Sequence, residues 1–165
     1  MSNTPKSASE KAFQENFVKE LQKYKWDAPD FLNGNKQKVT VSDLINHWRS
    51  ELNRINADQL EGVSLTDNEF KQVMAKVNQI SNSYEAAKLL AIEESKGKID
   101  GIYRDENPNI TRKQITLTIF KKAEVRGGDS SYHIAREVQT SNGNRFDIVL
   151  LINGLPLINI EQKRT

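Results

Sequence analysis

The chain has 165 residues, with 24 Lys and Arg against 22 Asp and Glu, so its net charge is only +2. That length suffices for one domain with a sizeable core, and the charge excludes a polybasic protein that wraps nucleic acid. The absence of Cys excludes a disulfide scaffold, a thiolate zinc site and a cysteine nucleophile. No apolar stretch approaches the ~20 residues that span a bilayer, and the polar start is no secretory signal, so we expect a cytoplasmic protein without membrane contact.

The segment 8–96 is predicted to be mainly helical, and the polar segment 1–7 before it is expected to be flexible. Ser7 and Glu10 fit a capping box, which predicts a first helix over about 8–25. One apolar stripe at helical spacing marks the expected buried face of this helix: Phe13, Phe17, Leu21 and Tyr24. Candidate N-caps of the later helices are Ser42, Thr66 or Asp67, and Ser83.

The segment 113–163 has the alternating apolar pattern and the turn residues of a sheet. Four strands are predicted, over 114–120, 132–138, 145–152 and 155–163. The third is apolar on both alternating faces, which indicates a central strand covered on both sides. We therefore predict an α/β fold, mixed α+β, with a mixed sheet of about four strands and flanking helices in a single domain over 1–165. Because the fourth strand is also apolar and ends the chain, we expect a fragment truncated before its closing helices.

Three charged residues interrupt the last two predicted strands, namely Asp147, Glu161 and Lys163. An unpaired carboxylate is costly to bury, and two carboxylates on neighbouring strands repel each other unless a cation joins them. Mg²⁺ prefers such oxygen ligands, and a nearby Lys can orient an attacking water or stabilise charge on a phosphoryl group. The pattern favours phosphodiester hydrolysis, although Lys163 pairing with one acid at a strand end is an alternative interpretation.

A shared metal site requires an irregularity in this hairpin. A two-residue turn at Asn153-Gly154 gives opposed pairs whose residue numbers sum to 307, which places Glu161 on the opposite face from Asp147. Pairs that sum to 308 place Asp147 opposite Glu161. We therefore predict either a three- or five-residue connection centred on Gly154, or a β-bulge between the turn and Asp147.

The hairpin sequence resembles a known family. The run from Asn144 to Lys163, with its Asn153-Gly-Leu-Pro turn between the two acidic strands, is similar to the nuclease motif of the type I restriction enzyme R subunit. That motif belongs to the PD-(D/E)xK nuclease superfamily and implies a restriction-endonuclease-like core. The segment from Ser9 to Trp26 is similar to the opening helix of the family, so the resemblance covers most of the chain.

The resemblance implies specific roles for the motif residues. Asp147 and Glu161 would bind Mg²⁺, with the backbone carbonyl of Gln162 as a further ligand, and Lys163 would position the hydroxide or stabilise the transition state. Phe146 stands where the superfamily motif has Pro, which leaves the chemistry intact. The sequence has no G-x-x-x-x-G-K-[ST] loop, so the ATP-driven DNA translocase of the family would lie in a missing downstream part.

Further candidates for the site are weighed individually. Glu10 is a candidate additional metal ligand, and its alternative role is the capping box with Ser7. Candidate contacts to DNA phosphates are Lys121, Lys122, Arg126, Arg136 and Arg145, although scattered surface basic residues are more often only solvated.

We therefore predict the endonuclease domain of a type I restriction enzyme R subunit, which cleaves double-stranded DNA with Mg²⁺. The resemblance implies partner subunits for methylation and for sequence specificity, and it leaves open whether the fragment cuts DNA alone. Two alternatives remain: a non-catalytic docking or DNA-binding module, and another nuclease of the same superfamily, such as a repair enzyme.

Overall fold

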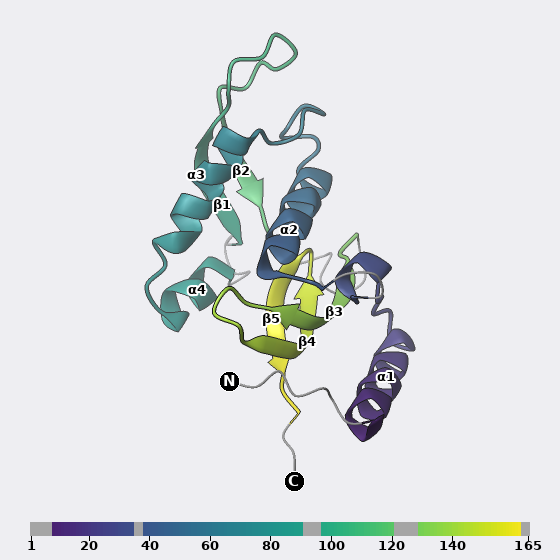
Figure 1. Ribbon diagram of the computed structural model, residues 1–165. Helices are drawn as coiled ribbons and strands as arrows, with labels where there is room; N and C mark the ends of the chain where they lie inside the picture. The colour runs from purple at the N-terminus through teal and green to yellow at the C-terminus, as the bar shows by residue number, and fades with distance from the viewer. Residues whose placement is uncertain (1–7, 35–37, 91–96, 121–128, 163–165) are drawn as a thin grey trace. The chain divides into compact units, whose positions relative to one another are not determined.

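The computed structural model describes residues 8–34, 38–90, 97–120 and 129–162. Its elements in chain order are α1 (Ala8–Gln22), η1 (Asp30–Leu32), α2 (Val41–Ile55), α3 (Asp67–Asn78), α4 (Ser83–Leu90), β1 (Lys98–Tyr103), β2 (Gln114–Thr118), β3 (Tyr132–Gln139), β4 (Arg145–Ile152) and β5 (Leu155–Ile160) (Figure 1). Helices precede strands, so the predicted mixed α/β class with an N-terminal helical part is confirmed. The chain forms two compact units, Met1–Asn46 with Ser131–Thr165 and His47–Ser130.

The sheet arrangement differs from the single four-stranded mixed sheet predicted from the sequence. The described strands form two sheets, an antiparallel pair β1–β2 and an antiparallel sheet of order β3–β4–β5. Within the described segments, parallel pairing is limited to two isolated bridges on β3, from Asp27 to His133 and from Thr40 to Gln139. The sequence pattern gives strand positions, but pairing partners depend on non-local contacts, and these divide the strands between the two units.

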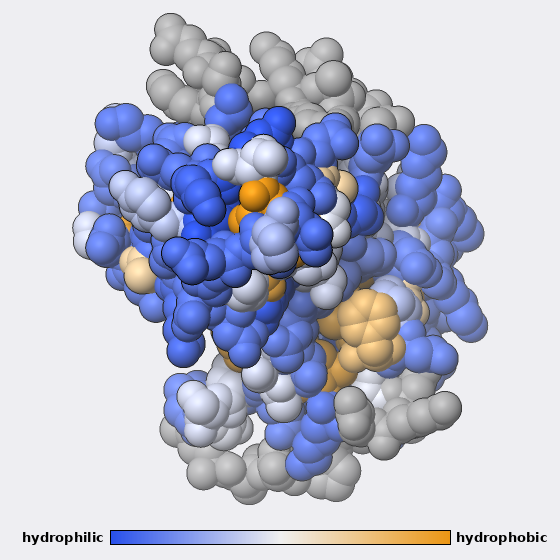
Figure 2. Space-filling view, turned by 90° about the horizontal axis from the view of Figure 1, so that it is seen from above, coloured by the Kyte–Doolittle hydropathy of each residue, from blue (hydrophilic) through white to orange (hydrophobic). Residues whose placement is uncertain are grey.

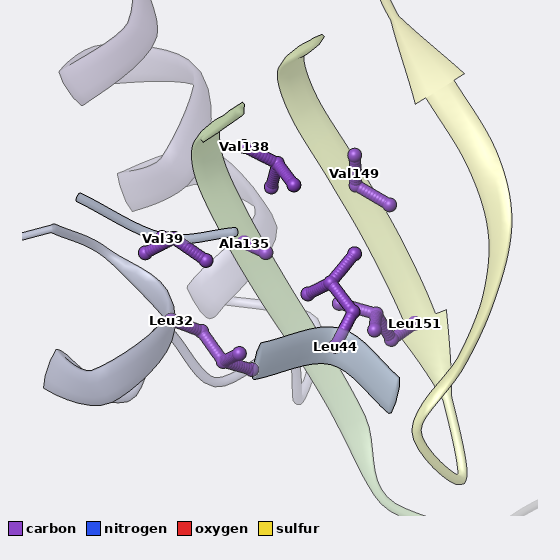
Figure 3. Packing of buried hydrophobic residues seen from close by; sticks show 7 residues of the cluster. All are labelled: Leu32, Val39, Leu44, Ala135, Val138, Val149 and Leu151. Carbon is purple, nitrogen blue, oxygen red and sulfur yellow. The ribbon is translucent and has the colours of Figure 1, made fainter. Parts of the chain in front are cut away.

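Both faces of the β3–β4–β5 sheet are covered at its central strand β4, as predicted. On one face Val18 of α1 packs with Ile134, Ile148 and Leu150, and the half-buried Phe17 and Leu21 join this cluster. On the other face a second cluster joins the sheet to η1, to the segment before α2 and to the first turns of α2 (Figure 3). Its members are Leu32, Val39, Leu44, Ala135, Val138, Val149 and Leu151. The strand β4, which carries Asp147, is therefore held between two apolar layers.

The buried face of α1 is rotated from the predicted stripe. Phe17 and Leu21 pack as expected, but Phe13 and Tyr24 are 49% and 74% exposed. Gln14 and Val18 are buried in their place. The helix ends at Gln22 rather than near residue 25, so Tyr24 falls outside the helical stripe. Ser7, the predicted cap, lies outside the described residues.

The helix caps follow the sequence rules with small shifts. Thr40 rather than Ser42 caps α2, because the Thr40 hydroxyl accepts from the Asp43 N–H while the Asp43 carboxylate accepts from the Thr40 N–H at 2.7 Å. Thr66 caps α3 in a reciprocal capping box with Glu69, as one of the two predicted candidates. Asn82, not Ser83, caps α4, since its side-chain oxygen accepts from the backbone N–H of Glu85.

The strand β1 was not predicted, and a β-bulge explains why. Ile99 pairs with Leu117 and Ile102 with Ile115, so β1 holds one extra residue between these pairs. Gly101 adopts a φ of 68° at this point. Ile99 and Ile102 are both buried although they lie three residues apart, which breaks the two-residue alternation that identifies a strand in sequence.

A buried ion pair ties α3 to the segment after β1. The Arg104 Nε atom lies 2.9 Å from the Glu69 Oε1 atom, and both side chains are only 1% exposed. The other guanidinium nitrogens of Arg104 donate to the backbone carbonyls of Leu60 and Val63. The second Glu69 oxygen accepts from the Thr66 N–H, so the pair is well satisfied by hydrogen bonds.

The surface is mostly hydrophilic in the view of Figure 2, where hydrophobic residues show only in small patches. Two exposed aliphatic side chains lie on β5, Leu157 and Ile158. In the described part of the chain, no helix has the length and apolar character to cross a bilayer.

Candidate functional site

The β4–β5 hairpin begins with the turn that its sequence predicts. Asn153 and Gly154 have φ values of 51° and 76°, so both central residues adopt the left-handed conformation that an Asn-Gly hairpin turn requires. Asn153 is also buried, and its backbone N–H and side-chain oxygen form reciprocal 3.0 Å hydrogen bonds with the backbone of Ser131. The turn is therefore fixed to the segment that enters β3.

The predicted irregularity is present as a bulge in β5. Ile152 pairs with Leu155 and Leu151 with Pro156, which is the register whose residue numbers sum to 307. From Leu150 onward the pairs sum to 308, ending with Ile148 opposite Ile160. Leu157 is the extra residue, since it lies between the two registers without a partner in the ladder. The paired ladder ends there, and the same register continued by one residue would set Asp147 against Glu161.

The two acids of the hairpin differ in exposure. Asp147 is 8% exposed, and its Oδ2 atom accepts a 2.8 Å hydrogen bond from the backbone N–H of Gln162. Glu161 is exposed, and its Oε1 atom accepts from the Asn159 side-chain amide at 3.0 Å. The Gln162 Oε1 atom is buried without a hydrogen-bond donor among the described residues. Asp147 of β4 therefore contacts the backbone that directly follows β5, next to Glu161 in the sequence.

A third acid, Glu137, was missed by the sequence analysis. On β3, Arg136 pairs with Ile148 and Val138 with Phe146, so Glu137 occupies the position opposite Asp147. Glu137 and Asp147 thus hold opposed positions on neighbouring strands, and Glu161 directly follows the end of β5. The short loop 141–143 gives a signal for this in the sequence, because a hairpin closed there pairs residues whose numbers sum to 284.

The basic candidates have different surroundings. The Arg145 Nη1 atom lies 2.9 Å from the Glu137 Oε2 atom, and these side chains are 32% and 34% exposed. Arg136 is half-buried and donates from Nε to the Asn33 side-chain oxygen at 2.8 Å, which ties β3 to η1. Glu10 is half-buried in the first turn of α1. Lys121, Lys122, Arg126 and Lys163 lie outside the described residues.

The fold and the site define a class of protein: a mixed α/β domain with acids at opposed positions of neighbouring strands, Glu137 on β3 and Asp147 on β4, beside a core that covers both faces of β4. The comparison with known families makes the assignment specific. The model of the family described as "Type I restriction enzyme R protein N terminus" matches residues 7–165, and the chain belongs to this family.

Curated relatives agree with this assignment. The "Type I restriction enzyme SauCOLORF180P endonuclease subunit" of Staphylococcus aureus (strain COL) is 29% identical over 133 residues, which cover 78% of this chain. The "Type I restriction enzyme SsaAORF53P endonuclease subunit" of Staphylococcus saprophyticus is 30% identical over 134 residues and again 78% of this chain. The chain spans only 13% of the length of each of these relatives.

Proposed function

We propose that this chain carries the endonuclease centre of a type I restriction enzyme R subunit, with Asp147, Glu161 and Lys163 as the catalytic residues. The reaction is hydrolysis of phosphodiester bonds in double-stranded DNA, and it requires a divalent metal. The observation that supports this most is the bulge at Leu157, because it is the irregularity that the paired acids need in order to share one ion.

The residues present fit Mg²⁺. The proposed ligands are the carboxylates of Asp147 and Glu161 and the backbone carbonyl of Gln162, all of them hard oxygen donors. The buried Gln162 Oε1 atom, which lacks a donor within the described part of the chain, supports a cation nearby. Bound Mg²⁺ would act as a Lewis acid toward the scissile phosphate and lower the pKa of bound water.

The protein residues then bind and orient the reactants. The Gln162 N–H holds the Asp147 carboxylate in place, which fixes one ligand before DNA arrives. Lys163, two residues after Glu161, is proposed to orient the attacking water or to stabilise the charge that develops on the phosphoryl group. Glu10 remains a proposed additional ligand. Arg136, Lys121 and Lys122 remain proposed phosphate contacts.

Other activities of the complete enzyme are proposed to reside elsewhere. The sequence has no P-loop, so ATP-dependent DNA translocation would belong to the remaining length that the curated relatives have. The partners proposed for the complete subunit are double-stranded DNA and the methyltransferase and specificity subunits of a restriction complex.

The test is cleavage by the full-length subunit assembled into its complex. We expect Asp147→Ala, Glu161→Ala and Lys163→Ala each to abolish DNA cleavage while ATP hydrolysis stays normal. The exposed acid Glu15 supplies a matched control, and Glu15→Ala is expected to cleave normally. Normal cleavage by Asp147→Ala would contradict the proposal and favour a docking module.

A second experiment tests the register that the bulge sets. Insertion of one Ala between Ile160 and Glu161 would place the inserted residue in the position opposite Asp147 and would move Glu161 to the other face of the sheet. We expect this insertion to abolish cleavage as completely as Asp147→Ala does. The matched control is Leu157→Ala, which keeps the residue count at an exposed position and is expected to cleave normally.

A further inference from the structure

Glu137 has an unusual backbone conformation for a residue inside a strand. Its φ is 57°, in the left-handed region that non-glycine residues avoid. The other described non-glycine residues with positive φ lie outside the strands, at Lys25, Glu61 and Asn153. Strained residues of this kind persist only where the surrounding structure holds them, and they concentrate at functional sites.

The left-handed residue changes which way β3 presents its side chains. Ala135 and Val138 pack in the same core cluster, with Val149 of β4 (Figure 3). In a regular strand, residues three apart lie on opposite faces. The pairs on either side of Glu137 keep one register, so no residue is inserted. The conformation of Glu137 therefore reverses the alternation of β3 at the position opposite Asp147.

The carboxylate of Glu137 contacts the arginine that precedes Asp147 by two residues. The Glu137 Oε2 and Arg145 Nη1 atoms are 2.9 Å apart, and Arg145 lies diagonally across the strand pair from Glu137. Each side chain is about one-third exposed, at 34% and 32%. A guanidinium has five N–H donors, and this contact uses one side of it, so donors remain for a second anion.

We propose that Glu137 is a positioning residue that holds the guanidinium of Arg145 beside Asp147, where it binds a phosphate of the DNA backbone. Guanidinium groups bind phosphate oxygens through two parallel hydrogen bonds, and a carboxylate on one edge restricts the many rotamers of the free side chain. This inference rests on the proposed nuclease function and adds to it a residue that touches no reactant itself.

Glycine at position 137 separates the backbone role from the carboxylate role. Glycine adopts positive φ without penalty, so Glu137→Gly keeps the shape of β3 and removes the carboxylate that pairs with Arg145. In the full-length assembled subunit, we expect Glu137→Gly to keep or raise the melting temperature and to lower the cleavage rate about tenfold. A purely structural role predicts normal cleavage by this variant, and that result would overturn the proposal.

A double-mutant cycle tests whether Glu137 acts on cleavage through Arg145. Arg145→Ala is expected to lower cleavage about 10- to 100-fold, and Glu137→Gly is expected to add nothing in that background because it acts through Arg145. If the losses of cleavage rate in the two single variants add in the double variant, the proposal is overturned. A higher Mg²⁺ concentration needed by Glu137→Gly alone would also overturn it, because that result would make Glu137 a metal ligand. The matched control is Glu20→Gln, which removes the charge from the exposed Glu20–Lys23 pair of α1 and should leave cleavage unchanged.

The same assay separates this inference from the proposed function. If Asp147→Ala abolishes cleavage but Arg145→Ala and Glu137→Gly cleave normally, only the positioning role fails. If Asp147→Ala also cleaves normally, the nuclease centre itself is elsewhere.

Discussion

The two compact units each contain a Glu–Arg ion pair. The two pairs have the same distance between their charged atoms, but they differ in burial and in the other hydrogen bonds of the arginine. Arg104 and Glu69 lie 2.9 Å apart and are 1% exposed, whereas Arg145 and Glu137 lie 2.9 Å apart and are about one-third exposed. The remaining donors of Arg104 bind backbone carbonyls. Among the described residues, Arg145 has no such backbone partner.

The difference shows that the same combination of residues, Glu with Arg, can have a structural role in one place and a binding role in another. A buried pair whose lone pairs and protons are all engaged fixes the fold around it, and loss of one partner leaves an uncompensated charge. A half-exposed pair contributes little to stability but keeps donors that a ligand can use. The unit with Glu69 uses its pair to close a loop, and the unit with Glu137 carries its pair beside the acids of the candidate site.

Arg104→Met tests this contrast most strongly. The substitution leaves the buried Glu69 carboxylate without its cation, so we expect the free energy of unfolding to fall by about 3–5 kcal/mol. Arg145→Met is the matched control and is expected to lower it by at most about 1 kcal/mol. Urea unfolding followed by circular dichroism measures both. Equal losses would remove the distinction between the two pairs.

Asn153 gives an intermediate effect, in the turn that carries the acidic hairpin. Asn153→Ala loses the hydrogen bond to Ser131 and places Ala at positive φ, so we expect about 1–3 kcal/mol of destabilisation. Asn153→Gly keeps the conformation and loses only the side-chain bond, so its cost should be about 1 kcal/mol. If the two variants unfold at the same urea concentration, the left-handed conformation contributes nothing measurable.

The smallest expected effect is the pH dependence from Glu61, in the unit that contains Arg104. Hydrogen bonds from the Thr111 side chain and from the Arg112 N–H lower the pKa of Glu61 from 4.5 to about 2. A carboxyl whose pKa is lowered by folding stabilises the protein above its unfolded pKa, and this contribution disappears as the pH falls from 4.5 toward 2. Glu61→Gln should therefore flatten the dependence of the melting temperature on pH in that window. An unchanged slope would show that Glu61 takes no part in it.

Local sequence signals were sufficient for a large part of the fold. The Asn153-Gly154 turn, the Thr66 cap and the positions of β2 to β5 follow from rules that involve only a few neighbouring residues. The bulge in β5 was predicted as one of two options, from the register that two acids need in order to share a cation.

The misses share a physical cause, which is dependence on contacts far along the chain. The bulge of β1 interrupts the apolar alternation by which a strand is identified in the sequence. The buried face of α1 depends on which of its residues contact the sheet, and the spacing of its aromatic residues does not determine this. Sequence periodicity assumes regular geometry, and both cases depart from it.

The sequence by itself determined where the chain turns, which strands are apolar on both faces and which acids interrupt them, because these follow from residue type and short-range spacing. Only the tertiary structure decided that Glu137 stands opposite Asp147 in a left-handed conformation, and that Glu69 meets Arg104 in the interior. Each of these depends on strand register or burial, whose free energy comes from packing between segments distant in the sequence.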